Sequence, residues 1–86
     1  MFNIVDKYMQ RLSITDVDNF AKNKNIILTP EELNFTYSFV KKNYKEMLQN
    51  PKLFNIDRYQ NQYSPETFIK IKKVFTEYFS KYQRFL

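Results

Sequence analysis

The amino-acid sequence predicts an all-α protein, a compact bundle of about four helices in a single domain over residues 1–86. Three observations favour this fold class. Glycine is absent, and the tight hairpin turns of β-sheets depend on it. Apolar residues recur at spacings of three and four, which is the period of an α-helix. Finally, Ser or Thr precedes Pro or an acidic residue at several places where a helix could begin.

The first two helices are predicted over residues 2–12 and 15–24. In the first, Phe2, Val5 and Met9 recur at helical spacing. Between the two helices, Ser13 and Thr15 each precede an Asp by three residues, so either hydroxyl could cap the second helix. Its inward-facing side chains should be Val17, Phe20 and Ala21.

The third helix is predicted over residues 30–49 and has the clearest start signal of the chain. Thr29 should cap it, Pro30 takes the first helical position, and Glu32 can reach back to the Thr29 amide. The preceding run of residues 26–28 is apolar, and we expect it to be a buried connection rather than a strand, because a lone short strand has no partner. The Asn50-Pro51 pair ends the helix.

The last helix is predicted over residues 65–85, with Ser64 as its cap and Pro65 at its first position. Its aromatic and aliphatic residues form one stripe: Phe68, Ile71, Phe75, Tyr78, Phe79, Tyr82 and Leu86. Residues 50–63 are less regular, and a short helix near residues 55–61 is the expectation there.

Composition restricts the chemistry that the chain can perform. Cys and His are both absent, so disulfides, His/Cys zinc sites and Ser-His or Cys-His catalytic pairs are excluded. The carboxylates that remain mostly follow helix-start or ion-pair patterns, as Glu31, Glu32 and Glu66 do. We therefore expect a protein that is not an enzyme, with no cofactor and no metal.

The opening segment lacks the apolar run of a signal peptide, because Asp6 and Lys7 interrupt it. No stretch has the roughly 20 apolar residues of a membrane span. The sequence therefore predicts a cytoplasmic protein without a membrane partner.

The first candidate surface is a pair of phenylalanines on the third helix. At about 100° per residue, Phe35 and Phe39 fall nearly opposite the main apolar stripe of that helix. Another segment of the chain could cover them. If none does, contiguous exposed aromatic residues indicate a protein partner or a homodimer interface. The predicted function is accordingly a protein–protein interaction module, with an unknown partner or a second copy of itself.

The second candidate surface is basic. The formal net charge is +5, and it divides into −1 over residues 1–40 and +6 over residues 41–86. An ordinary solvated face, and an excess of Lys from AT-rich codons, would explain the pattern. Contact with phosphates or with an acidic protein is the functional alternative. The candidate residues are Lys41, Lys42, Lys45, Lys70, Lys73, Lys81 and Arg84.

The alternative function is DNA binding through a helix-turn-helix. The helices predicted over 15–24 and 30–49, with the short link between them, have the required order. However, Glu31 and Glu32 open the helix that would enter the groove, and phosphates would repel them. Nucleic acid is therefore the less favoured partner.

Several motifs together resemble a known family. They are Ile14-Thr15, Phe20-Ala21-Lys22, Leu28-Thr29-Pro30-Glu31-Glu32, Ser64-Pro65-Glu66-Thr67 and Phe75. In this order they are similar to the YqfT-like family, short uncharacterised proteins of Bacillus-type Gram-positive bacteria. The resemblance implies a bacterial, cytoplasmic and helical protein. It implies no activity and no site residues.

Overall fold

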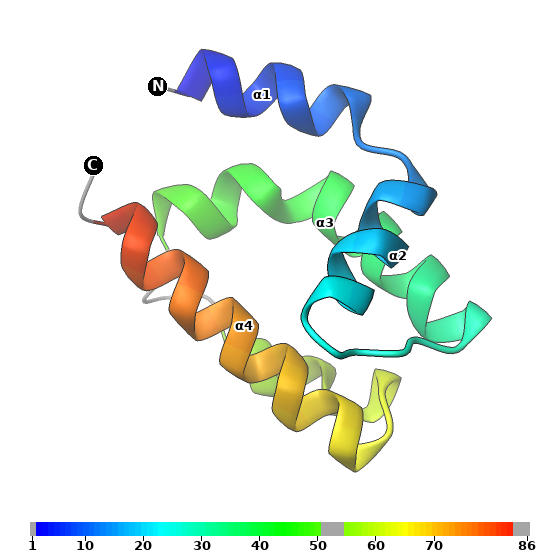
Figure 1. The fold of residues 1–86 in the computed structure, drawn as a ribbon. Coiled ribbons are helices and arrows are strands. Elements are labelled where there is room, and N and C mark those ends of the chain that lie inside the picture. The colour runs from blue at the N-terminus through cyan, green and yellow to red at the C-terminus, as the bar shows by residue number, and fades with distance from the viewer. Residues whose placement is uncertain (1, 51–54, 84–86) are drawn as a thin grey trace. The chain divides into compact units, whose positions relative to one another are not determined.

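The computed structural model describes residues 2–50 and 55–83, and these form four α-helices and one 3₁₀-helix (Figure 1). In chain order the elements are α1 (Phe2–Arg11), α2 (Ile14–Asn23), α3 (Pro30–Gln49), η1 (Ile56–Gln62) and α4 (Pro65–Gln83). No residue in the two described ranges belongs to a strand. The prediction of an all-α protein is confirmed.

The predicted bounds differ from the observed ones at a few ends. The first helix ends at Arg11 rather than residue 12, and the second spans Ile14–Asn23 rather than residues 15–24. The short helix near residues 55–61 is a 3₁₀-helix over Ile56–Gln62, with Asn55 at its cap. The third helix has the predicted bounds. The last helix is described as far as Gln83, so its predicted end at residue 85 lies outside the described residues. The apolar residues Leu53 and Phe54 also lie outside them.

Reciprocal capping boxes begin α2 and α3. In α2 the Asp16 amide donates to Ser13 Oγ at 3.1 Å, and the Ser13 amide donates to Asp16 Oδ2 at 2.9 Å. Ser13 is therefore the cap, and the alternative, Thr15, lies inside the helix. Thr29 and Glu32 exchange the same two bonds at the start of α3, at 3.1 and 2.9 Å. Both boxes satisfy amides that would otherwise lack partners at a helix start.

The C-terminus of α2 closes in a Schellman motif built on asparagine. The Ile26 amide donates to the Ala21 carbonyl at 2.8 Å, and the Asn25 amide donates to the Lys22 carbonyl at 3.0 Å. Asn25 has φ of 62°, the left-handed conformation that this motif requires. Ala21 and Ile26 are both buried, as the apolar contact that accompanies the motif requires.

Contacts divide the chain into two compact units, Met1–Tyr44 and Lys45–Leu86, and α3 belongs partly to each. That the chain is a single domain stays a prediction. Within the first unit, polar contacts join α1 to α3. The Tyr44 hydroxyl donates to Asp6 Oδ1. Lys41 Nζ donates to the Met9 and Gln10 carbonyls, at 2.8 and 3.0 Å, and so satisfies carbonyls at the end of α1.

Two of the residues predicted to face inward do not. Phe20 is 43% exposed, whereas Val17 and Ala21 are buried. The reason is angular: Phe20 lies about 100° around the helix from Ala21, and Lys24 Nζ sits 5.9 Å from its ring centre. Ile27 is 72% exposed between the buried Ile26 and Leu28. Exposure therefore alternates along this connection, as it does where successive side chains point in opposite directions.

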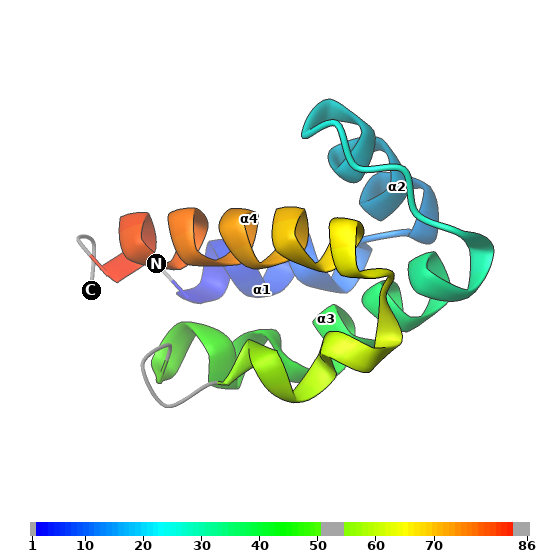
Figure 2. The ribbon, with the colours of Figure 1, turned by 90° about the horizontal axis from the view of Figure 1, so that it is seen from below.

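In the second unit, η1 packs against α4, and Figure 2 shows it running beside the first half of that helix. The rings of Tyr63 and Phe68 lie 6.3 Å apart, and Phe68 is buried. Ser64 caps α4, because its Oγ accepts from the Thr67 amide at 3.3 Å. Of the predicted stripe, Phe68 is buried and Ile71, Phe75 and Tyr78 are half-buried; the side chains of Phe79, Tyr82 and Leu86 lie outside the described residues.

Candidate interaction surfaces

The structure brings Phe35 and Phe39 together as a stacked pair on α3. Their ring centres are 5.6 Å apart and their planes differ by 27°. Both side chains are half-buried, so the chain covers each of them in part. The backbone beneath is fixed by a further bond, since Asn43 Nδ2 donates to the Phe39 carbonyl at 3.0 Å.

Polar residues border the phenylalanine pair. Ser38 and Lys42 are exposed on the same helix, and the helical angle places both within about 60° of Phe35. An apolar centre with a polar border is the usual anatomy of a protein–protein contact surface.

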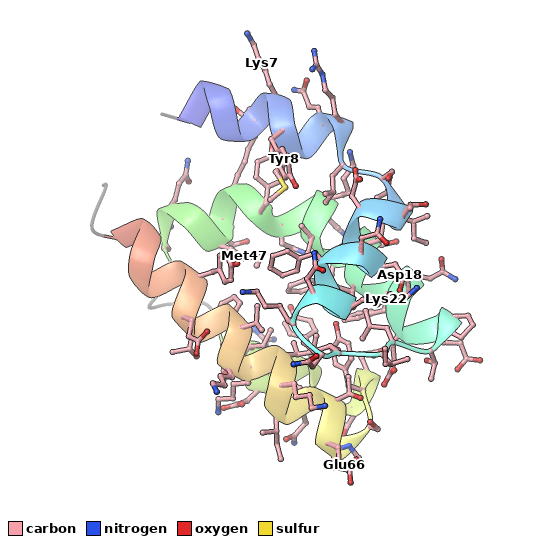
Figure 3. The ribbon with its side chains drawn as sticks, viewed as in Figure 1. Lys7, Tyr8, Asp18, Lys22, Met47 and Glu66 are labelled. Atoms are coloured by element: carbon pink, nitrogen blue, oxygen red, sulfur yellow. The ribbon has the colours of Figure 1, made fainter. Side chains whose placement is uncertain are left out.

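Other apolar side chains of the first unit are also exposed. Tyr8 is 64% exposed and extends from α1 on the side away from Lys7 (Figure 3). On α2, Lys22 and Asp18 form an ion pair at 2.9 Å, with 55% of the Lys22 side chain and 25% of the Asp18 side chain exposed; Figure 3 labels both residues on this helix. With Phe20 of α2 also 43% exposed, aromatic contact area is available on α1 and α2 as well as on the α3 pair.

The predicted basic residues fall into different environments. Lys41 is half-buried, and its Nζ donates hydrogen bonds to carbonyls of α1, as described above. The same Nζ lies 5.9 Å from the Tyr37 ring centre. Four of the others are exposed: Lys42, Lys45, Lys70 and Lys73. The backbone of Lys81 is helical, but its side chain, like the whole of Arg84, lies outside the described residues.

A groove along α4 and η1 contains residues that the sequence analysis did not single out. It is lined by Asp57, Gln60, Phe68, Ile69, Lys72, Lys73, Thr76 and Glu77. Lys72 Nζ crosses from α4 to Asp57 Oδ1 on η1 at 2.8 Å. The one sign of this groove in the sequence is Ile69, an apolar residue on the polar face of the predicted last helix. That Ile69 lies beside η1 depends on the path of residues 55–63, which the sequence does not determine.

Tyr44 has the one electrostatic perturbation that is clear in the described part of the chain. The hydrogen bond to Asp6 raises the pKa of the Tyr44 hydroxyl above its ordinary value of 10.0, and desolvation and the negative charge of Asp6 act in the same direction. A tyrosine held in its protonated form is neither a base nor a nucleophile at neutral pH. The contact joins α1 to α3.

Comparison with known proteins returned no match, whether to protein families, to curated proteins or to solved structures. Within residues 2–50 and 55–83, no three acidic side chains gather where they could hold a metal ion. No helix in these two ranges is both long and apolar enough to cross a membrane.

Proposed function

We propose that this chain is a small, non-enzymatic protein–protein interaction module of the cytoplasm, acting through Phe35 and Phe39 on a protein partner or on a second copy of itself. The observation that supports this function is the stacked, half-exposed phenylalanine pair with its polar border. The resemblance to the YqfT-like family agrees with a cytoplasmic helical protein and carries no information about activity.

Energetic arguments favour the pair as the centre of a contact. Aromatic side chains have a large apolar area and few rotatable bonds, so burying them against a partner releases water at a small cost in conformational entropy. Stacking already orders the two rings in the free protein, which lowers that cost further. The rest of the α3 surface nearby is polar and can surround such a contact.

Sedimentation of the purified protein over a range of concentrations, combined with capture of partners from its own cells, tests this function. We expect Phe39→Asp to abolish self-association or partner capture, because a carboxylate cannot be buried unpaired at low cost. Phe20→Asp is the matched control, since Phe20 is an exposed phenylalanine on another helix of the same unit. A Phe39→Asp protein that remains folded, sediments as the unaltered protein does and captures the same partners would rule out the function.

DNA binding through α2 and α3 is the alternative. The two helices follow each other across residues 24–29, as a helix-turn-helix requires. However, Glu31 is exposed in the first turn of α3, where it would face phosphates. Titration with duplex DNA at several salt concentrations decides, because phosphate contacts produce steep salt dependence. Salt-sensitive binding that Glu31→Gln strengthens would favour the alternative.

A further inference from the structure

One stripe along α3 has an acidic residue at one end, a basic residue at the other, and an aromatic and a small residue between them. Its four residues are Glu31, Phe35, Ser38 and Lys42. At about 100° per residue they fall within about 60° of the helix surface, and the two charged residues lie roughly 16 Å apart along the axis. Glu31, Ser38 and Lys42 are exposed, and Phe35 is half-buried. The alternating steps of four and three residues are those of the contact line between two paired helices.

The stripe is complementary to itself when two copies of α3 run antiparallel. Positions 31 and 42, like positions 35 and 38, lie symmetrically about the midpoint of residues 36–37. A twofold axis through that midpoint therefore sets Glu31 of each copy opposite Lys42 of the other. It also sets the large ring of Phe35 opposite the small side chain of Ser38, an alternation that lets facing helices interdigitate.

A parallel arrangement of the two helices lacks both kinds of complementarity. It would place Glu31 opposite Glu31 and Lys42 opposite Lys42, and like charges that face each other weaken a contact. It would also place the two Phe35 rings against each other and leave a gap between the two Ser38 side chains. Only the antiparallel arrangement matches both charge and size, so the stripe selects the partner and its direction.

We propose that α3 pairs with α3 of a second copy in an antiparallel homodimer along the Glu31–Phe35–Ser38–Lys42 stripe. This inference rests on the proposed function and deepens it, because it identifies the partner of the Phe35–Phe39 pair as a second copy. Phe39 borders the stripe, and its stacking on Phe35, with ring centres 5.6 Å apart, orders the central ring before the copies meet. The stripe is about three helical turns long, so the interface is small and the dimer should form reversibly.

Sedimentation of the full chain over a range of concentrations measures the dissociation constant of the dimer. We expect Lys42→Glu to raise this constant at least about tenfold, because it puts two like-charged contacts in place of two opposite ones. Lys7→Glu is the matched control, since it makes the same change in net charge at an exposed lysine of α1. The control should change the constant by no more than about twofold. Raising the salt concentration should weaken the unaltered dimer.

The twofold symmetry also predicts a rescue. Glu31→Lys alone should weaken the dimer as Lys42→Glu does, whereas the two changes in one chain restore opposite charges at both contacts. We expect the doubly changed protein to dimerise within about threefold of the unaltered one. Because a lysine in the first turn of α3 opposes the helix dipole, circular dichroism checks that each variant is folded. An equimolar mixture of the two single variants should likewise dimerise more tightly than either variant alone.

The proposal is overturned if the unaltered protein is monomeric at every concentration tested, or if Lys42→Glu weakens the dimer no more than Lys7→Glu does. A parallel dimer would give the second result, because reversing one charge leaves its facing charges alike. Failure of the proposed function would look different, since Phe39→Asp would then leave both self-association and partner capture unchanged. A dimer that Phe39→Asp abolishes and Lys42→Glu does not affect would overturn the antiparallel pairing and leave the proposed function in place.

Discussion

Asn25 shows how a single residue compensates for a missing residue type. A helix that ends in a Schellman motif needs a left-handed residue, and glycine usually supplies it. This chain has no glycine, and Asn25 takes the position with φ of 62°. Asparagine is the next-best choice, because its short polar side chain tolerates the left-handed region better than other side chains do. The motif then directs Ile26 into the buried part of the molecule.

Substitutions at Asn25 should reveal this conformational requirement. We expect Asn25→Ala to lower the free energy of unfolding by about 1 kcal/mol, because alanine is strained at positive φ. Asn25→Gly should be neutral or slightly stabilising, since glycine meets the requirement without strain. Urea unfolding of the three proteins measures both effects. Equal stability of the Ala and Asn proteins would mean that residue 25 does not hold the left-handed conformation in solution.

At the scale of elements, α1 depends on side chains from α3. Lys41 reaches the last carbonyls of α1 from a position more than 30 residues away in sequence. A cation at a helix C-terminus pairs with the negative end of the helix dipole and with carbonyls that have no partner inside the helix. Arg11, in the last turn of α1 itself, adds a second cation. The stability of this short helix therefore depends on tertiary contacts.

Lys41→Met should loosen α1 specifically. Methionine keeps an unbranched side chain of similar length but removes the charge and both hydrogen bonds. We expect amide hydrogen exchange in α1 to accelerate about fivefold, which corresponds to about 1 kcal/mol. Lys42→Met is the control, because Lys42 is the adjacent exposed residue and should leave exchange in α1 unchanged. Equal exchange in the two variants would show that Lys41 does not hold α1.

Which parts could be predicted depended on how local their determinants are. The capping box of Thr29 closes within three residues, so the start of α3 could be located from sequence. For α2 the sequence offered two caps, Ser13 and Thr15, and the structure selects Ser13. Asn55 also caps its element locally, but a short stretch can form an α- or a 3₁₀-helix with the same cap. Lys41 looked like any surface lysine, because its partners on α1 come from tertiary structure.

The candidate surfaces follow the same division. Phe35 and Phe39 lie one helical turn apart, so their adjacency could be predicted from sequence. How far the rest of the chain covers them could not be predicted, and both side chains are half-buried. The sequence shows Ile69 as an apolar residue on the polar face of the last helix. The position of Asp57 beside it could not be predicted from sequence, because that position depends on η1 packing along α4. Phe20 was predicted to face inward and does not. It lies at the edge of the apolar face of α2, and at such positions tertiary packing decides whether a side chain is buried.

At the scale of the whole molecule, the absence of His and Cys determines the response to pH. Few groups titrate between about pH 6 and pH 9, so stability should be nearly constant there. Above that range Tyr44 contributes. Its pKa is raised in the folded state, so the protonated hydroxyl stabilises the fold fully below the unfolded pKa of about 10, and this stabilisation is lost as pH rises through the higher folded pKa.

Comparison with Tyr44→Phe isolates this contribution. The two proteins share every other titratable group, so the difference in unfolding free energy between them isolates the Tyr44 hydroxyl. We expect the unaltered protein to be the more stable at neutral pH and the difference to shrink above about pH 10. A difference that stays constant with pH would contradict the assigned role of the Asp6 contact.

The pairing of Tyr44 with Asp6 also gives the molecule an optical reporter of its own. The chain has seven Tyr and no Trp, so phenols dominate its ultraviolet emission. A phenol becomes a stronger acid when it is excited, and a carboxylate that already accepts its hydrogen bond can take the proton and quench the emission. Departure of α1 from α3 would therefore brighten the intrinsic fluorescence, and the opening of this helix could be timed without attaching a dye.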